Sequence, residues 1–224
     1  RKFDSFRRFG VELEVSNTVP KYKIRNAIKA VSKVPVKILA WNYTVNNLEW
    51  EVKEDASCGP QGLHGPCGYE IASYVGSGID DVLHIAQVAD HLKSKKVEVT
   101  NFCGLHVHVD AADLTPEQVG RIIAHWIKVE YTLGMMMPAR RRHNEFCRSL
   151  SQSGKWSFDR SQRYTGEQLW DLMKPQDLSP HDNGDRRVNL NLVNYARGVW
   201  YPAKHQRKTL EFRWAEGTLD GTTV

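Results

Sequence analysis

The stretch Phe102-Cys-Gly-Leu-His-Val-His-Val-Asp110 determines how the rest of the chain is interpreted. As a β-strand it places His106, His108 and Asp110 on one face and leucine and valine on the other, because successive strand side chains alternate. A merely solvated strand face carries Thr, Ser, Lys or Glu rather than two imidazoles. A His-x-His strand is a weak indication of ligand binding when it stands alone. The indication becomes stronger if other strands of the chain carry a similar polar face.

Two further segments have such a face. Residues 9–15, Phe-Gly-Val-Glu-Leu-Glu-Val, predict a strand in which Glu12 and Glu14 lie opposite three apolar side chains. Residues 69–73 predict a short strand that carries Glu70. Two carboxylates on neighbouring same-face positions repel each other, so a dry site would protonate one of them unless a cation lay between them. A polar solvent-facing surface remains the alternative interpretation of each strand by itself.

Two strands are predicted near the end of the chain. In residues 208–214, Glu211 and Arg213 alternate with Leu, Phe and Trp. Residues 187–193 predict a strand whose polar face is shared by Asn189 and Asn191. The charged and amide-bearing faces thus recur from one end of the chain to the other.

Between these segments the chain alternates helices and strands, so the fold class is predicted as α+β. Helices are expected at residues 20–33, 77–95, 115–136 and 165–173, and a strand pair at 36–39 and 44–53. Thr-Pro-Glu-Gln at 115–118 and Thr-Gly-Glu-Gln at 165–168 are capping boxes that start the last two helices. In the second helix we expect a buried stripe formed by Ile79, Val82, Leu83, Ala86, Ala89 or Val88, and Leu92.

Composition sets the limits of the problem. The chain has 224 residues, 41% of them hydrophobic, which is enough for one sizeable core, and we expect a single domain over residues 1–224. No window approaches 18 consecutive apolar residues, so we expect no membrane span. The net charge of +5 suits an anionic ligand but does not choose among nucleotide, nucleic acid and acidic surface. The last eight residues resemble the middle of a domain, which suggests a truncation at the C-terminus.

The four cysteines form no Cys-x-x-Cys pair and no dense disulfide framework. Reduced thiols and a cytoplasmic location are therefore expected. The loop from Cys58 to Cys67 contains His64 and offers three possible zinc ligands, but it lacks finger spacing and an evident fourth ligand. Whether this loop binds a metal stays open at this point.

A shared site follows if the sheet curves so that the polar faces converge. The side chains that would then meet are Glu12, Glu14, Glu70, His106, His108, Glu211 and Arg213, with Asn189 and Asn191 beside them. Four carboxylates in one place require divalent cations, and an oxygen-rich ligand set suits Mg²⁺ or Mn²⁺ better than zinc. The chain contains no Gly-x-x-x-x-Gly-Lys-[Ser/Thr] phosphate loop. A nucleotide would therefore be held through metals and side chains.

These motifs resemble, in order and over about residues 9–220, those of the amidoligases. That family belongs to the carboxylate–amine ligase superfamily, which includes glutamine synthetase and glutamate–cysteine ligase. The matching segments are 9–15, Asp55-Ala-Ser57, Gly68-Tyr-Glu-Ile-Ala-Ser73, Gly104–Asp110, Thr209-Leu-Glu-Phe-Arg213 and Gly217-Thr-Leu219. The Cys58–Cys67 loop has no place in the family pattern.

The resemblance implies a curved, mainly antiparallel sheet with a polar concave active-site face, backed by helices as in the glutamine-synthetase catalytic fold. It also implies ATP-dependent amide-bond formation through an acyl phosphate, with Mg²⁺ or Mn²⁺. The ligands implied for the ion nearer the carboxylate substrate are Glu14, Glu70 and Asp55. The ligands implied for the ion that bridges the ATP phosphates are Glu12, His106 and Glu211.

The same resemblance implies roles for cationic and amide side chains. His108 would contact a phosphate, and Arg213 would stabilise the transferring phosphoryl group. A second positive contact would come from Arg140, Arg141, Arg142 or Arg187, and Asn144 and Asn189 are further candidates. The catalytic set implied is Arg213, His108, Glu70, Arg140 and Arg187. The nucleotide-binding set implied is His108, Arg213, Asn189 and Arg141.

Two other functions remain as alternatives. A zinc hydrolase would use His106, His108 and one glutamate, with a metal-bound water as nucleophile, but most of the other acids would then have no role. An inactive polyanion-binding module would use Arg140–Arg142, although the chain lacks a basic stripe interleaved with aromatics. For the ligase we expect small-molecule or peptide carboxylate and amine partners, without nucleic acid or membrane. The particular substrates and the oligomeric state do not follow from the sequence.

Overall fold

The structure is a computed structural model that describes residues 7–39, 47–58, 68–152, 164–173, 186–200, 202 and 207–224. The chain divides into two compact units. The first unit comprises Arg1–Val109 and Ala215–Val224, and the second unit comprises Asp110–Trp214. Helices and strands alternate in both units, which confirms the predicted α+β class.

The first unit is built on five strands in the order β2-β3-β4-β1-β5. Their bounds are Phe9–Ser16 for β1, Val36–Ile38 for β2, Trp50–Asp55 for β3, Gly68–Ala72 for β4 and Gly104–Asp110 for β5. Strand β1 pairs antiparallel with both β4 and β5, and β3 pairs antiparallel with β4, whereas β2 and β3 are parallel. The sheet is therefore mixed, with antiparallel pairing in its centre.

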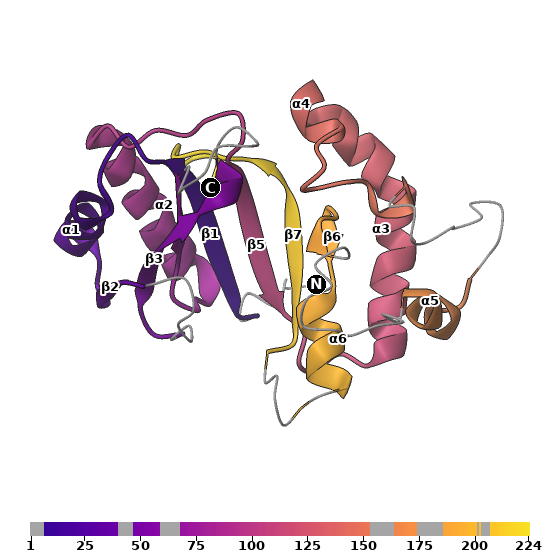
Figure 1. Ribbon diagram of the computed structural model, residues 1–224. Coiled ribbons are helices and arrows are strands. Elements are labelled where there is room, and N and C mark those ends of the chain that lie inside the picture. Colours follow the sequence, from indigo (N-terminus) through magenta and orange to yellow (C-terminus); the bar gives the residue numbers. More distant parts are fainter. Residues whose placement is uncertain are drawn as a thin grey trace. The chain divides into compact units, whose positions relative to one another are not determined.

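Helices α1 (Lys21–Val31) and α2 (Gly78–Ser94) belong to the same unit (Figure 1). One core contains the apolar residues of β1 together with buried residues of both helices: Val11, Leu13, Val15, Ile24, Ile28, Ile85, Val88 and Leu92. Because side chains alternate along β1, Glu12 and Glu14 lie on the opposite face of the strand from this core. The helices thus cover the apolar face and leave the polar face for a site.

The buried stripe predicted for α2 was wrong in its first half. Ile79 and Leu83 are 65% and 59% exposed, and the buried face instead begins at His84 and Ile85. The cause is a polar contact that the apolar periodicity could not reveal, because His84 Nδ1 lies 2.9 Å from the buried Tyr74 hydroxyl. That hydrogen bond satisfies one nitrogen of the buried imidazole, so a polar residue can occupy the buried face of the helix.

The last residues of the chain belong to the first unit. Leu219 is 4% exposed and lies in its core. The Gly217 amide donates to the Cys103 carbonyl at 3.0 Å, and the Gly221 amide donates to the Asp90 carboxylate at 2.8 Å. The first unit is therefore assembled from two segments that are distant in sequence.

The second unit contains α3 (Pro116–Met136), α4 (Ala139–Arg142), α5 (Gly166–Met173), β6 (Leu190–Asn191), α6 (Val193–Trp200) and β7 (Thr209–Glu216), whose last two residues belong to the first unit. Both predicted capping boxes are confirmed: Thr115 and Gln118 exchange hydrogen bonds at the start of α3, and Thr165 and Gln168 do so at the start of α5. The predicted alternation in β7 is also present, because Phe212 and Trp214 pack near Trp126 of α3.

The strand predicted at residues 187–193 is mostly absent. The strand is reduced to Leu190 and Asn191, which pair with Phe212 and Glu211, and to an isolated bridge between Val188 and Arg148; a helix begins at Val193. The Asn191 side chain accepts a hydrogen bond from the Val193 amide at 2.9 Å, which satisfies a free donor at the start of α6 and turns the chain out of the strand. The strand predicted at 44–53 begins at Trp50, after a turn at 47–49, and residues 44–46 lie outside the described part.

Short 3₁₀ turns complete the described elements, at Ala56–Cys58 and Leu150–Gln152. Among the described residues, no helix is both long enough and apolar enough to cross a membrane.

Candidate metal centre

Strand register brings acidic and imidazole side chains of the first unit together. Glu12 on β1 lies directly opposite His106 on β5, and Glu14 lies opposite Glu70 on β4. On the other side of β4, Glu70 lies opposite Lys53 of β3. Directly opposed residues of antiparallel strands project from the same face. Four strands therefore contribute to one row of charged side chains.

Both histidines of the His-x-His strand contact the same carboxylate. His106 Nδ1 lies 3.2 Å from Glu12 Oε2, and His108 Nε2 lies 3.0 Å from Glu12 Oε1. The other ring nitrogen of His106 lies 3.5 Å from Glu14 Oε1, so this imidazole bridges two carboxylates. His106 is buried, whereas Glu12 and His108 retain about a fifth of their side-chain surface, at 20% and 18%. The predicted shared face of the two histidines is confirmed.

These contacts set the charge of Glu12. Burial by itself raises the pKa of Glu12, but the charge of His108 and hydrogen bonds from His106 and His108 outweigh it and hold the pKa well below its usual range. Glu12 is therefore an anion at neutral pH, as a metal ligand must be.

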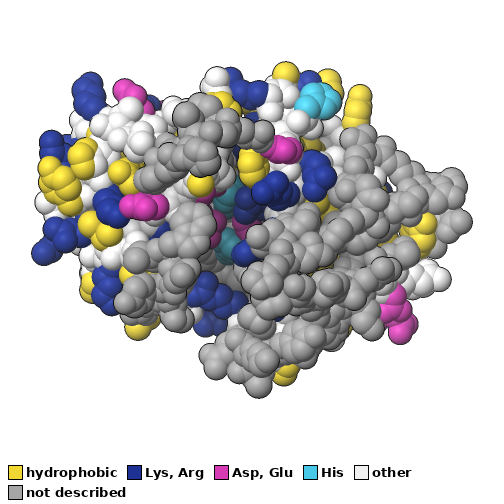
Figure 2. Space-filling model, in the orientation of Figure 1, with side chains coloured by type: hydrophobic (Ala, Val, Ile, Leu, Met, Phe, Trp, Pro, Cys, Tyr) yellow, Lys and Arg dark blue, Asp and Glu magenta, His cyan; other side chains and the backbone are white. Residues whose placement is uncertain are grey.

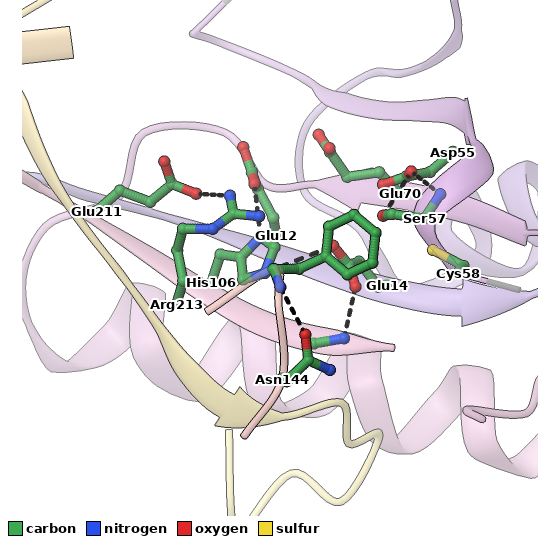
Figure 3. Close-up of polar contacts among 12 residues, drawn as sticks. Glu12, Glu14, Asp55, Ser57, Cys58, Glu70, His106, Asn144, Glu211 and Arg213 are labelled. Atoms are coloured by element: carbon green, nitrogen blue, oxygen red, sulfur yellow. Dashed lines mark hydrogen bonds and ion pairs between the residues drawn. The ribbon is translucent and has the colours of Figure 1, made fainter. Parts of the chain in front are cut away.

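Glu14 lies deeper, with 5% of its side chain exposed. Its Oε2 accepts a hydrogen bond from the Gly104 amide at 2.5 Å. One ligand atom each from Glu14, Asp55 and Cys58 lie within 4.8 Å of one another (Figure 3). Asp55 is oriented by Ser57, whose amide and hydroxyl both donate to its Oδ1 at 2.7 Å. One atom from each of these three side chains, two oxygens and one sulfur, could therefore contact the same ion.

Glu70 forms an ion pair with Lys53 at 2.7 Å. Burial and the negative charge of Glu12 nevertheless raise the pKa of Glu70 to about 7, against the opposing charge of Lys53. The larger cause of this raised pKa is burial, and the neighbouring carboxylate of Glu12 adds to it. A divalent cation would favour the charged form of both carboxylates, and the oxygen-rich ligand set fits Mg²⁺ or Mn²⁺.

Three residues of this centre were missed as site residues in the sequence. Lys53 and Ser57 look like ordinary polar residues of a strand end and a loop, although Lys53 does share an alternating face with Asp55. Cys58 was considered only as a zinc ligand with His64 and Cys67, and those two lie outside the described residues. The structure instead places the buried Cys58 beside Glu14 and Asp55.

The thiol of Cys58 also has a sulfur neighbour. Cys58 and Cys103 hydrogen-bond each other, and this contact lowers the pKa of Cys103 to about 7 while it raises that of Cys58. Thr100 supports the pair, because its hydroxyl donates to the Cys58 carbonyl at 3.2 Å and its amide donates to Cys103 Sγ at 3.3 Å. Cys58, Cys103 and Cys147, the cysteines among the described residues, are not in disulfides.

The second unit carries the remaining predicted residues. On β7, Arg213 donates a hydrogen bond to Glu211 (Figure 3), and the other oxygen of Glu211 accepts from Asn191 Nδ2 at 2.5 Å. Glu211 is buried, and its carboxylate is held from both sides. The predicted sharing of a face by Asn191 and Glu211 is confirmed.

Asn189 does not share that face. Its amide nitrogen donates to Glu130 at 3.1 Å, and its amide oxygen accepts from the Trp126 indole at 2.9 Å. Residue 189 lies just before the two-residue strand β6, so strand alternation does not govern it. Its described side-chain contacts are therefore with α3 rather than with the polar face of β7.

The three arginines at positions 140–142 have different surroundings. Arg140 is exposed. Arg141 is buried and donates to the carbonyls of Arg213 and Trp214, at 2.7 and 3.4 Å. Arg142 donates to the Met137 and Met135 carbonyls at the end of α3, at 2.8 and 3.2 Å. These side chains do not form one basic patch.

Two other candidates lie near this run. Arg187 is exposed and its guanidinium lies 4.8 Å from the ring centre of Phe146, a cation–π contact. Asn144 accepts a hydrogen bond from the Phe146 amide at 2.7 Å. On the face of the first unit seen in Figure 2, Lys and Arg side chains are interspersed with acidic and hydrophobic ones.

The fold and the site together define an α+β protein with a cluster of carboxylates and imidazoles on one face of a largely antiparallel sheet. The family described as "Putative amidoligase enzyme" matches residues 5–224, and the chain belongs to this family. No curated protein and no solved structure matches the chain at a significant level. The family assignment confirms the resemblance seen in the sequence and indicates a ligase.

Proposed function

We propose that the protein is an ATP-dependent carboxylate–amine ligase that forms an amide bond through an acyl phosphate. A carboxylate oxygen of the acid substrate attacks the γ-phosphorus of ATP, and ADP leaves. The amine then attacks the acyl carbon, phosphate leaves, and the amine loses a proton. The acid and the amine are expected to be small molecules or peptides, and the setting cytoplasmic, where ATP is abundant.

The observation that carries this proposal is the excess of negative charge in the first unit. Four carboxylates, those of Glu12, Glu14, Asp55 and Glu70, lie near one lysine and two imidazoles, and burial and the charge of Glu12 raise the pKa of Glu70 to about 7. Such a cluster suits two divalent cations better than one, which is what phosphoryl transfer uses. Bound cations would neutralise charge on the ATP phosphates and on the transferring group.

The residues proposed to hold the ions are those implied by the family resemblance. Glu14, Asp55 and Glu70 are proposed for the ion nearer the acid substrate. Glu12 and His106 are proposed for the ion at the phosphates, with Glu211 as the third ligand. His108 and Arg213 are proposed to contact the phosphoryl group, and a glutamine-synthetase-like arrangement of the sheet is part of the proposal.

Metal binding is the first test. Titration with Mn²⁺, followed by electron paramagnetic resonance, should detect two ions in the presence of ATP. Asp55→Asn should weaken binding of one ion at least tenfold, because a neutral amide is a poor ligand for a hard cation. Its matched control is Glu54→Gln: Glu54 is the preceding strand residue, so its side chain points to the other face, where it pairs with Lys21. Equal loss in both variants, or no loss in Asp55→Asn, contradicts the proposed site.

The place of Glu211 has a separate test in the same titration. If it is a ligand of the phosphate-bridging ion, Glu211→Gln should weaken Mn²⁺ binding only when ATP is present. Unchanged Mn²⁺ affinity in the presence of ATP would remove Glu211 from the ligand set and leave the first-unit ligands untouched.

The chemistry itself can be tested without the natural amine. Hydroxylamine replaces the amine in acyl-phosphate reactions and yields a hydroxamate that ferric ion turns coloured. A panel of amino acids and short peptides with free carboxylates should include one that gives hydroxamate, ADP and phosphate in equal amounts. Glu14→Gln should abolish this signal. A protein that binds neither Mg²⁺ nor ATP would exclude the ligase function.

A zinc hydrolase is the second candidate, because His106 and His108 both lie within 3.2 Å of one carboxylate, that of Glu12. A two-histidine, one-carboxylate zinc site would use these three side chains. Metal analysis of the purified protein separates the two candidates. One equivalent of zinc, with activity that needs no nucleotide, favours the hydrolase, whereas nucleotide-dependent binding of Mg²⁺ or Mn²⁺ favours the ligase.

A further inference from the structure

Arg141 is a cation buried in the second unit, and it contacts main-chain carbonyls. It is 2% exposed, whereas the two adjacent arginines have other surroundings. Arg140 is exposed, and Arg142 donates to carbonyls at the end of α3. A fully buried guanidinium is rare unless its donors are used, because desolvating a charge is costly. The hydrogen-bond partners of Arg141 therefore indicate the role of this buried side chain.

We propose that Arg141 is a positioning residue, which fixes the backbone of β7 at Arg213 and thereby orients the Arg213 guanidinium. The described contacts of its side chain are with consecutive residues of this strand. Its terminal nitrogen donates to the Arg213 carbonyl at 2.7 Å, and its Nε donates to the Trp214 carbonyl at 3.4 Å. This inference rests on the proposed function in one respect, namely that Arg213 contacts the phosphoryl group.

Both polar groups of the Arg213 backbone are held. Its carbonyl accepts from Arg141, and its amide donates to the Asn189 carbonyl at 2.9 Å. Asn189 is in turn fixed by Glu130 and Trp126 of α3. The Arg213 side chain in turn donates a hydrogen bond to Glu211. The main chain of β7 is thus clamped between α4 and the segment that precedes β6.

A guanidinium is required for this clamp. Its planar fork presents donors in fixed directions and can reach two carbonyls at once, whereas a lysine ammonium is a flexible point charge. Arg141 itself is held by its place in α4, where its amide donates to the Pro138 carbonyl at 2.8 Å and its carbonyl accepts from Cys147 Sγ at 3.5 Å. Arg141→Lys keeps the positive charge and removes the planar arrangement of guanidinium donors.

The proposal is tested by a double-mutant cycle on binding of Mg·ATP, followed by calorimetry. Arg141→Lys should weaken binding about tenfold. Arg213→Gln should weaken it at least as much. Because Arg141 acts through Arg213, the double variant should bind within about twofold of Arg213→Gln alone. Losses that multiply in the double variant overturn the proposal, since they would mean that Arg141 acts independently of Arg213.

The matched control is Arg142→Lys. Arg142 is the adjacent arginine of the same short helix and also donates to two carbonyls, but those carbonyls belong to the end of α3. In this variant the Arg213 amide should exchange within twofold of its rate in the wild-type protein, because the described hydrogen bonds of the Arg142 side chain are to the end of α3 rather than to β7. A general loosening of the second unit would instead raise this rate equally in Arg141→Lys and Arg142→Lys, and that result overturns a positioning role.

Hydrogen exchange provides a readout that does not depend on the function. The Arg213 amide should exchange about tenfold faster in Arg141→Lys than in Arg142→Lys, and equal rates overturn the proposal. If the wild-type protein binds no Mg·ATP, the ligase proposal fails and this comparison alone decides the role of Arg141. If Arg141→Lys does not fold, the Nε–H of Arg141 in the wild-type protein decides it: exchange slower than that of Arg140 supports the clamp, and equal exchange overturns it.

Discussion

Glu70 and Glu130 are two glutamates whose surroundings differ: Glu130 is 1% exposed, whereas the Glu70 side chain is 20% exposed. Glu130 on α3 accepts hydrogen bonds from the Leu150 and Ser151 amides, each at 3.0 Å, and from the Ser149 hydroxyl at 2.8 Å. Glu70 has Lys53 as a partner but lies close to another carboxylate. The first glutamate is supplied with hydrogen-bond donors and is structural, whereas the second combines burial with a neighbouring carboxylate and is a candidate for binding.

The raised pKa of Glu70 leads to a pH dependence of metal binding. The pKa of about 7, set by burial and by Glu12, means that the group is protonated in the folded, metal-free protein below pH 7. A cation must displace that proton, so Mn²⁺ affinity should rise by up to about tenfold per pH unit below pH 7 and level off above it. Titrations at pH 6, 7 and 8 measure this. Glu70→Gln should remove that part of the rise, and an unchanged slope in the variant would refute the assignment.

Replacing Glu130 should destabilise the second unit. Glu130→Ala leaves buried amide and hydroxyl donors without an acceptor, and we expect a loss of about 3 kcal/mol in the free energy of unfolding. Urea denaturation followed by circular dichroism measures it. Glu117→Ala is the control on the same helix, because Glu117 is 57% exposed and its pairing with Arg121 contributes less than about 0.5 kcal/mol. Equal stability of the two variants would contradict the anchoring role.

At the scale of elements, α3 organises the second unit through close approach as well as through apolar packing. A Cβ added at Gly120 would lie 1.8 Å from the Gly166 carbonyl oxygen, at the first residue of α5. Glycine is therefore required on α3 at the point where α5 begins. The buried side chains of both helices, among them Val119, Ile123 and Trp170, then share one core.

Gly120→Ala should consequently destabilise the protein, although alanine is the better helix former by about 1 kcal/mol. The clash is with a backbone oxygen, which cannot move without displacing α5, and overpacking of this kind costs about 2–3 kcal/mol. Thermal unfolding monitors the change. Gly10→Ala serves as the comparison, since a Cβ there has no neighbour within 4 Å, and it should unfold within a few degrees of the wild-type protein. A stabilised Gly120→Ala variant would show that α5 does not pack as described.

For the whole molecule, the important fact is that the chain leaves the first unit after Val109 and returns to it at Ala215. Both crossings lie at strands that carry candidate site residues, β5 with His106 and His108, and β7 with Glu211 and Arg213. The residues that the amidoligase resemblance groups together are thus distributed over both units. The returning segment is also part of the core of the first unit.

A substitution at Leu219 tests whether the last residues of the chain complete the core of the first unit. It is 4% exposed in the core of the first unit, so Leu219→Ala should lower the free energy of unfolding by about 2–4 kcal/mol, the loss expected for a buried leucine. Leu48→Ala, at a residue that is 75% exposed, should change it by less than about 0.5 kcal/mol. Chemical denaturation of both variants provides the measurement. Similar values for the two would mean that the final residues do not complete the first unit.

Much of the candidate site could be predicted because alternation along a strand is a local property. The spacing of Glu12 and Glu14, and of His106 and His108, already places each pair on one face whatever the strand packs against. The capping boxes at Thr115 and Thr165 are local for the same reason, and both are present in the structure. Local patterns failed at His84 of α2, where polar contacts with Tyr74 and Lys33 accompany a buried imidazole, and at Asn191, whose side chain accepts from the first amide of α6.

The sequence alone therefore established the fold class, the polar faces of the strands and the family. Only the tertiary structure decided that Glu70 lies opposite both Glu14 and Lys53, that Cys58 lies beside Asp55, and that Arg141 supports β7 from the interior. Those facts depend on which strands pair, in what register, and on which side chains the core encloses. Strand pairing and core packing are stabilised by contacts between residues that are far apart in the chain. The periodicity of a single segment carries no information about such contacts.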